Sequence, residues 1–153
     1  MTANQRVIEI LIQSFWPMLK AGLIFTIPLT LISFFFGLCI AIFVAIVRVA
    51  KIKFLDGFVR FYVWIFRGTP LLVQIFIIFY GLPKLGILLD PFPAAVISFS
   101  LNVGAYSSET IRAAILSISK GQWEAGYSLG MNYFQVLRRI ILPQAAKVSI
   151  PPL

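Results

Sequence analysis

The chain has 153 residues, of which 60% are hydrophobic and 12% charged, and its formal net charge is +8. Soluble domains are about 45–50% apolar and about 25% charged, so this composition excludes an ordinary soluble domain, a disordered chain and a collagen-like chain. It predicts an integral membrane protein with room for about three or four helical spans.

The first predicted span covers residues 21–47, a stretch without charged residues between Lys20 and Arg48. It is long enough to cross a hydrocarbon core of about 30 Å with some tilt. Pro28 lies in its first two turns, where a membrane helix tolerates a kink. Residues 1–20 mix charged and apolar side chains, and we expect them to form a short interfacial helix.

A basic loop follows the first span and places the chain in the membrane. Residues 48–60 carry one acidic residue, Asp56, and four basic residues: Arg48, Lys51, Lys53 and Arg60. Because loops on the cytoplasmic side carry an excess of Lys and Arg, we place this loop in the cytoplasm and the N-terminus outside.

The second predicted span covers residues 61–83, contains Arg67 and returns the chain to the outside. Gly68, Thr69 and Pro70 form a small, helix-breaking step within it, which could open a cavity between helices. The segment 84–90 is nearly neutral, as an external loop can be.

The third predicted span covers residues 91–118. Pro91 and Pro93 open it, in the first turn, where a helix accepts proline. Its second half carries two charged residues, Glu109 and Arg112.

Residues 120–147 form a second basic segment, which we also place in the cytoplasm. We expect a short helix over Trp123–Leu129 that ends at Gly130, because glycine commonly supplies the left-handed residue after a helix. Asn132 is suited to cap a second helix over Tyr133–Ile140. Pro143 is placed beyond the end of that helix.

This cytoplasmic segment reads QWEAGYSLGMNYFQVLRRIILPQA from Gln122. It resembles the signature of the integral membrane subunits of bacterial ABC importers: E-A-A, three residues, G, nine residues, then I-x-L-P. The matching residues are Glu124, Ala125, Gly130, Ile140, Leu142 and Pro143. Gly126 replaces the second alanine, which softens the helix by about 1 kcal/mol without moving the register. We expect Ala125 and Gly126 to give this helix a slim side that can enter a cleft.

Two further stretches, YVWIFRGTPLLVQ and SLNVGAYSSETIRAAI, resemble the polar amino-acid branch of that family and are most similar to cystine permeases. The resemblance implies an all-α, polytopic transmembrane bundle of the ABC importer permease type, in one domain with three spans and a cytoplasmic coupling loop. Family members usually have five spans and run some tens of residues further, so we expect a fragment that lacks the last two.

The resemblance also implies partners. These are two ATPase subunits, a second permease subunit that is identical or homologous, and an external amino-acid-binding protein. The chain has no G-x-x-x-x-G-K-[ST] motif, so ATP would be bound by the ATPase partner, and we expect no cofactor in this chain.

Charged residues within the spans need partners. Arg67 and Glu109 would lie roughly 9 and 13 Å from the cytoplasmic ends of their spans, so they can pair, and Arg112 is an alternative partner for Glu109. Both readings stay open: a tether between helices, or a direct role in gating or transport.

Gln74 and Asn102 also lie level with each other, roughly 20 and 24 Å deep, and Tyr106 is one turn below Asn102 on the same face. Their amides suit hydrogen bonds to a zwitterion or to each other. We predict that these three residues line part of a substrate path, against the alternative of simple contact between helices.

The competing hypothesis is a membrane-embedded enzyme, or another helical membrane protein without an ATPase partner. The chain has no histidine and one cysteine, Cys39, which we interpret as a small residue facing lipid or a helix. A metal site and a histidine-activated nucleophile are therefore not expected. The basic residues flank apolar runs, so we expect no nucleic acid as partner. The sequence predicts a multi-pass protein of the cell membrane that is not an enzyme.

Overall fold

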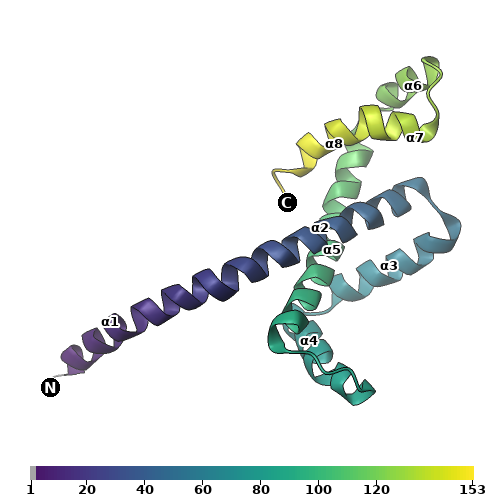
Figure 1. The fold of residues 1–153 in the computed structure, drawn as a ribbon. Coiled ribbons are helices and arrows are strands. Elements are labelled where there is room, and N and C mark those ends of the chain that lie inside the picture. The colour runs from purple at the N-terminus through teal and green to yellow at the C-terminus, as the bar shows by residue number, and fades with distance from the viewer. Residues whose placement is uncertain (1–2) are drawn as a thin grey trace.

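The computed structural model describes residues 3–153, which are helical apart from short connections (Figure 1). No β-strand occurs among them, which confirms the all-α fold class. In chain order the elements are α1 (Ala3–Ala21), the π-helical turn η1 (Gly22–Thr26), α2 (Ile27–Ala50), α3 (Lys53–Gly68), α4 (Leu71–Phe76), the π turn η2 (Ile77–Gly81), the 3-10 turn η3 (Leu82–Leu85), α5 (Pro91–Ser117), α6 (Lys120–Ser128), α7 (Tyr133–Val136), the π turn η4 (Leu137–Ile141) and α8 (Leu142–Ser149).

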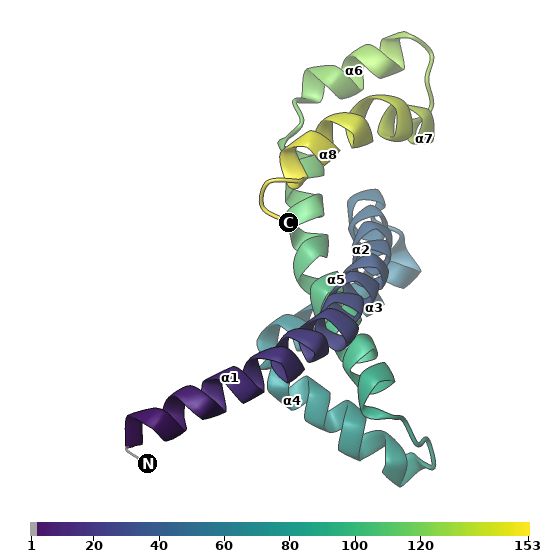
Figure 2. The same ribbon diagram turned by 60° about the vertical axis from the view of Figure 1, so that its left-hand side comes forward.

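The first three elements form one continuous rod, and α1 projects away from the other helices in both views (Figures 1 and 2). The structure therefore does not separate an interfacial helix over 1–20 from a first span over 21–47. The charge of Lys20 suggested that boundary, but a single exposed lysine does not interrupt backbone hydrogen bonding. By length and composition, Glu9–Ala50 could cross a membrane.

Each of the three π turns ends two residues before a proline, namely Pro28, Pro83 and Pro143. Proline lacks an N–H group, and its ring clashes with the carbonyl four residues earlier in a regular α-helix. A wider turn relieves that clash, and at η4 the N–H of Leu142 donates to the carbonyl of Leu137, five residues back. The helices therefore continue past Pro28 and Pro143.

Helices α2 and α5 cross at close range and make the most extensive contact of the fold. A Cβ atom added to Gly37 would lie 2.7 Å from Cγ1 of Val103, and one added to Gly104 would lie 2.7 Å from Cγ2 of Ile40. Small residues at such a crossing let two backbones approach, which is how membrane helices pack. On α2 they recur every fourth residue and are buried: Ser33, Gly37, Ala41 and Ala45.

Helix α3 runs back beside α2 after a turn of two residues, Lys51 and Ile52, with Lys51 in the left-handed region (φ 50°). The predicted loop over 48–60 is therefore wrong, because Arg48 and Arg60 both lie within helices. After α3 the chain bends by 110° into Leu71–Leu85, so the expected second span over 61–83 is a bent pair of helices.

By length and composition, one helix of the described residues could cross a membrane, or two segments if the bent pair counts as one span. Helix α5 has 27 residues but is not among them. Its buried face carries many small polar side chains, Ser98, Ser100, Ser107 and Ser108. These serines lower the mean hydropathy of α5. The three spans over 21–47, 61–83 and 91–118 stay a prediction.

The main core joins α2, α5 and the hairpin of α6, α7 and α8, of which α8 packs on α5 (Figure 1). Its buried members are Ala41 and Ala45 of α2, Ile111, Ala114 and Ile115 of α5, Val136 of α7, Leu137 and Ile141 of η4, and Ala145 of α8. The hairpin is thus joined to the long helices by side-chain packing.

Candidate functional site

The end of α3 is held by side chains that replace missing backbone donors. The last carbonyls of a helix have no partner within it, and Pro70 has no N–H group to offer. The hydroxyl of Thr69 donates to the Ile65 carbonyl at 2.8 Å. The Gln74 amide nitrogen donates to the carbonyls of Phe66 at 2.8 Å and Thr69 at 3.0 Å. The predicted helix-breaking step at residues 68–70 is confirmed, and Gln74 stabilises it.

Gln74 also links the break to α5. The side-chain amide of Asn102 donates to Oε1 of Gln74 at 3.1 Å, so the two amides predicted to lie level do meet. Gln74 is 5% exposed and uses both ends of its amide on protein partners. Of the three predicted path residues it is therefore the one least available to a ligand.

Tyr106 lies beside the same break and is 48% exposed. Its hydroxyl donates to the Arg67 carbonyl at 3.4 Å, and Cζ of Arg67 lies 5.5 Å from the centre of the tyrosine ring. This distance suits attraction between a guanidinium group and an aromatic face. Tyr106 thus contacts Arg67 through both its hydroxyl and its ring.

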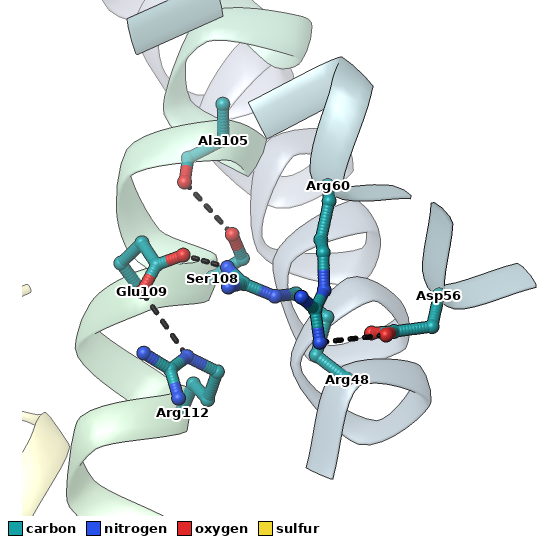
Figure 3. Close-up of polar contacts among 7 residues, drawn as sticks. All are labelled: Arg48, Asp56, Arg60, Ala105, Ser108, Glu109 and Arg112. Atoms are coloured by element: carbon teal, nitrogen blue, oxygen red, sulfur yellow. Dashed lines mark hydrogen bonds and ion pairs between the residues drawn. The ribbon is translucent and has the colours of Figure 1, made fainter. Parts of the chain in front are cut away.

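The predicted pair of Arg67 with Glu109 does not form. Glu109 instead makes ion pairs with Arg48 on α2 and with Arg112 one turn along α5, the latter at 3.1 Å (Figure 3). The prediction counted depth from residue 61, whereas α3 begins at Lys53. The alternative partner Arg112 is confirmed.

The sequence prediction does not include Arg48 as a site residue, because it ends the first span at Val47. A usable signal is present: no glycine, proline or asparagine lies between Leu38 and Ala50, so nothing in the sequence ends the helix at Val47. Figure 3 places a second pair beside this cluster, Arg60 with Asp56 at 2.8 Å. Together with Arg112, these four charged residues, Arg48, Asp56, Arg60 and Glu109, lie where α2, α3 and α5 meet.

The hairpin begins with α6, which ends as predicted. Gly130 has φ +74°, in the left-handed region. Its N–H donates to the Tyr127 carbonyl at 2.9 Å, and the N–H of Met131 donates to the Gly126 carbonyl at 3.2 Å. These two bonds form a Schellman motif, which satisfies carbonyls at the end of the helix.

The second helix of the hairpin also begins as predicted. Asn132 Oδ1 accepts from the Gln135 N–H, and Gln135 Oε1 accepts from the Asn132 N–H, both at 2.9 Å. This reciprocal pair is a capping box. The predicted end at Ile140 is wrong, because η4 widens ahead of Pro143 and the helix continues into α8.

Contacts across the hairpin hold its two arms together. The rings of Trp123 and Tyr133 stack with centres 5.5 Å apart. The Gln144 amide donates to Oε1 of Gln122 at 3.1 Å, which joins α8 to α6. Burial raises the pKa of the Tyr133 hydroxyl, and the neighbouring Tyr127 raises it further, so Tyr133 is neutral at physiological pH.

The signature residues divide into an outer and an inner set. Gly126 is buried, and a Cβ there would lie 2.7 Å from Cγ2 of Val136. Gly126 therefore faces the interior of the hairpin, and the expectation that it faces an external cleft is wrong. Ile140 and Leu142 pack against the core. The exposed members are Glu124, Ala125, Gly130 and Pro143, and two large apolar residues are exposed with them, Leu129 (75%) and Phe134 (64%).

Comparison with known proteins places these features in a family. Residues 37–153 match the model of the binding-protein-dependent transport system inner membrane component. The L-cystine transport system permease protein TcyB of Bacillus subtilis is 60% identical over 141 residues, covering 92% of this chain and 60% of that protein. The putative glutamine transport system permease protein GlnP of Rickettsia felis is 46% identical over 133 residues, covering 86% of this chain and 61% of that protein.

Among solved structures, the chain is similar to one described as the crystal structure of an amino acid ABC transporter with histidines. The TM-score is 0.82 at 36% sequence identity, over 92% of this chain and 66% of that one. The fold is thus that of an ABC transporter permease. The chain spans about 60% of the length of the two curated relatives named above.

Proposed function

The chain belongs to the family of binding-protein-dependent transport system inner membrane components, and we propose that it is the permease subunit of an ATP-driven amino-acid importer. The observation that carries this proposal is the hairpin of α6, α7 and α8, which exposes Glu124 and Ala125 on one side and shares a buried core with α2 and α5 on the other. The relatives are permeases and not enzymes, so nothing favours the membrane-embedded enzyme.

We propose that α6 docks on an ATPase subunit. Glu124 is the middle residue of α6, past its first turn, so its support for docking is its exposure to solvent and not the helix dipole. The Schellman motif at Gly130 and the stacked rings of Trp123 and Tyr133 support a compact, stiff knob. Helix α8 packs on α5, and Ala145 shares a buried core with Ile111 and Ile115, so movement of the knob would pull on α5. Closure of the ATPases would thereby drive alternating access.

The proposed substrate is a polar amino acid, and the 60% identity to an L-cystine permease favours L-cystine. Its path would pass the break in α3, where Asn102 and Tyr106 offer polar groups and Gln74 holds Asn102 in place. Replacing Asn102 with leucine should impair uptake while the subunit still inserts and binds its ATPase. Unaltered uptake kinetics for both Gln74→Leu and Asn102→Leu would assign these amides to packing alone.

The proposed partners are two ATPase subunits, a second permease subunit and an external binding protein, in the lipid bilayer. The deciding experiment expresses the full-length permease with its neighbouring ATPase and binding protein, and measures uptake of labelled L-cystine in competition with a panel of amino acids. We expect ATP-dependent uptake and co-purification of the ATPase. Recovery of the permease without an ATPase, and without uptake of any amino acid, would overturn the proposal.

We also propose that the N-terminus and residues 84–90 face outside, while the α2–α3 turn and residues 120–147 face the cytoplasm. The support is the basic-residue asymmetry together with the compact hairpin. Single cysteines at Lys53, Lys84 and Lys120, in a chain with Cys39 replaced by serine, can be tested with an impermeant thiol reagent in intact cells. Only position 84 should react, and reaction at 120 but not 84 would reverse the topology.

A further inference from the structure

Arg67 differs from the other arginines near the helix crossing in having no acidic partner. Arg48 and Arg112 contact Glu109, and Arg60 contacts Asp56. Among residues 3–153, no carboxylate lies within ion-pair distance of Arg67, although this residue lies near the end of α3, next to the break. A charge within a membrane span is unfavourable without a partner, so an anion beside this guanidinium group would stabilise it.

The surroundings of Arg67 hold it in place without satisfying it. Tyr106 contacts its carbonyl through the hydroxyl and its guanidinium group through the ring. The nearby carbonyls of Ile65 and Phe66 already accept from Thr69 and Gln74. A ring face attracts a cation but accepts no strong hydrogen bond, so the N–H donors of the guanidinium remain available to a carboxylate.

We propose that Arg67 binds the α-carboxylate of the transported amino acid. This inference rests on the proposed function. A guanidinium group presents a planar fork that matches a carboxylate with two parallel hydrogen bonds. Asn102, one turn from Tyr106 on α5, donates to Gln74 and keeps its own Oδ1 as an acceptor for the α-ammonium group. Arg67 and Asn102 together would therefore recognise both charges of a zwitterion.

The test compares amino acids with analogues that lack only the carboxylate. L-cystine is paired with cystamine, which has the same disulfide and amines, and L-glutamine is paired with 4-aminobutanamide. Binding is measured on the full-length permease–ATPase assembly in lipid nanodiscs. The external binding protein is left out, so that its selectivity does not affect the measured affinities. The variants are Arg67→Gln and Arg67→Lys, and Lys53→Gln is the control, because it removes a charge from the exposed opposite end of α3.

We expect the wild type to bind an amino acid at least about tenfold more tightly than its decarboxylated analogue. Arg67→Gln should lose about tenfold in affinity for the acid and little for the amine, Arg67→Lys should lose less, and Lys53→Gln should match the wild type. Equal losses for acid and amine in both Arg67 variants would overturn the inference, because a partner subunit's carboxylate or a lipid phosphate would then be the anion. Should the wild type neither bind nor import any amino acid, the proposed function itself would fail.

Discussion

Gly126 offers a sharp test of the hairpin, because two effects of adding a methyl group there have opposite signs. Alanine is favoured over glycine inside a helix by about 1 kcal/mol. The new Cβ would, however, lie 2.7 and 3.0 Å from the two Cγ atoms of Val136, which is fully buried. Overpacking of this kind costs about 1–3 kcal/mol. The contact with Cδ1 of Ile140, at 3.0 Å, matters less because that atom ends a flexible side chain.

The balance is a net loss of about 1 kcal/mol for Gly126→Ala, which corresponds to about fivefold faster amide exchange in α6. Hydrogen–deuterium exchange on the full-length protein measures this directly. Gly121→Ala is the matched control on the same helix, because the nearest atom to its Cβ is Oγ of Ser119 at 4.0 Å. That variant should slow exchange.

A second background makes the reasoning refutable. In a Val136→Ala chain the obstructing atoms are gone, so Gly126→Ala should there slow exchange in α6 instead of raising it. If Gly126→Ala protects α6 as much as Gly121→Ala does when Val136 is present, the inward orientation of Gly126 is wrong. The signature glycine would then face outward, as the sequence had suggested.

Three further outcomes follow from the geometry. Gly130→Val should abolish transport and substrate-stimulated ATP hydrolysis without preventing membrane insertion, because φ +74° strains a β-branched residue, whereas Gly130→Asn should retain most activity; wild-type coupling in the valine variant would exclude the hairpin as the coupling element. Asn132→Ala removes the capping box and should destabilise the second arm by about 1 kcal/mol, seen as faster exchange near Gln135 and contradicted by unchanged exchange. Glu109→Gln removes the ion-pair partner of both Arg48 and Arg112 and should lower the melting temperature of the full-length protein more than Arg112→Gln does, at a cost of about 2 kcal/mol; equal shifts would show that the cluster is not held by Glu109.

The hairpin of α6, α7 and α8 is the part most open to prediction from sequence, because its signals are local. A glycine that must adopt positive φ and an asparagine before a helix act within a few residues, and both were predicted correctly at Gly130 and Asn132. The direction of Gly126 was not, since Val136 approaches it from ten residues along the chain and only packing reveals which side of α6 is covered.

The long helices show the opposite case. Arg48 lies inside α2, and its ion pair with Glu109 of α5 is a tertiary contact with no local signature in the sequence. The amides of Gln74 and Asn102 were correctly matched by depth. Their hydrogen bond could not say whether they serve a ligand, since Gln74 turned out to be occupied by the carbonyls at the end of α3.

The ion pair between Arg48 and Glu109 also imposes an order on biosynthesis. The partners are 109 − 48 = 61 positions apart, and α3, the bend and α4 are made between them. At about 5–20 residues per second, the ribosome delivers Glu109 roughly 3–12 s after Arg48. During that interval α2 and α3 form a nascent hairpin. The acidic residue near Arg48 is then Asp56 alone, which lies on α3. When α5 is made, its small residues pack against those of α2, and Glu109 pairs with Arg48. The packing of α2 and α3 is therefore complete only after α5 has been synthesised.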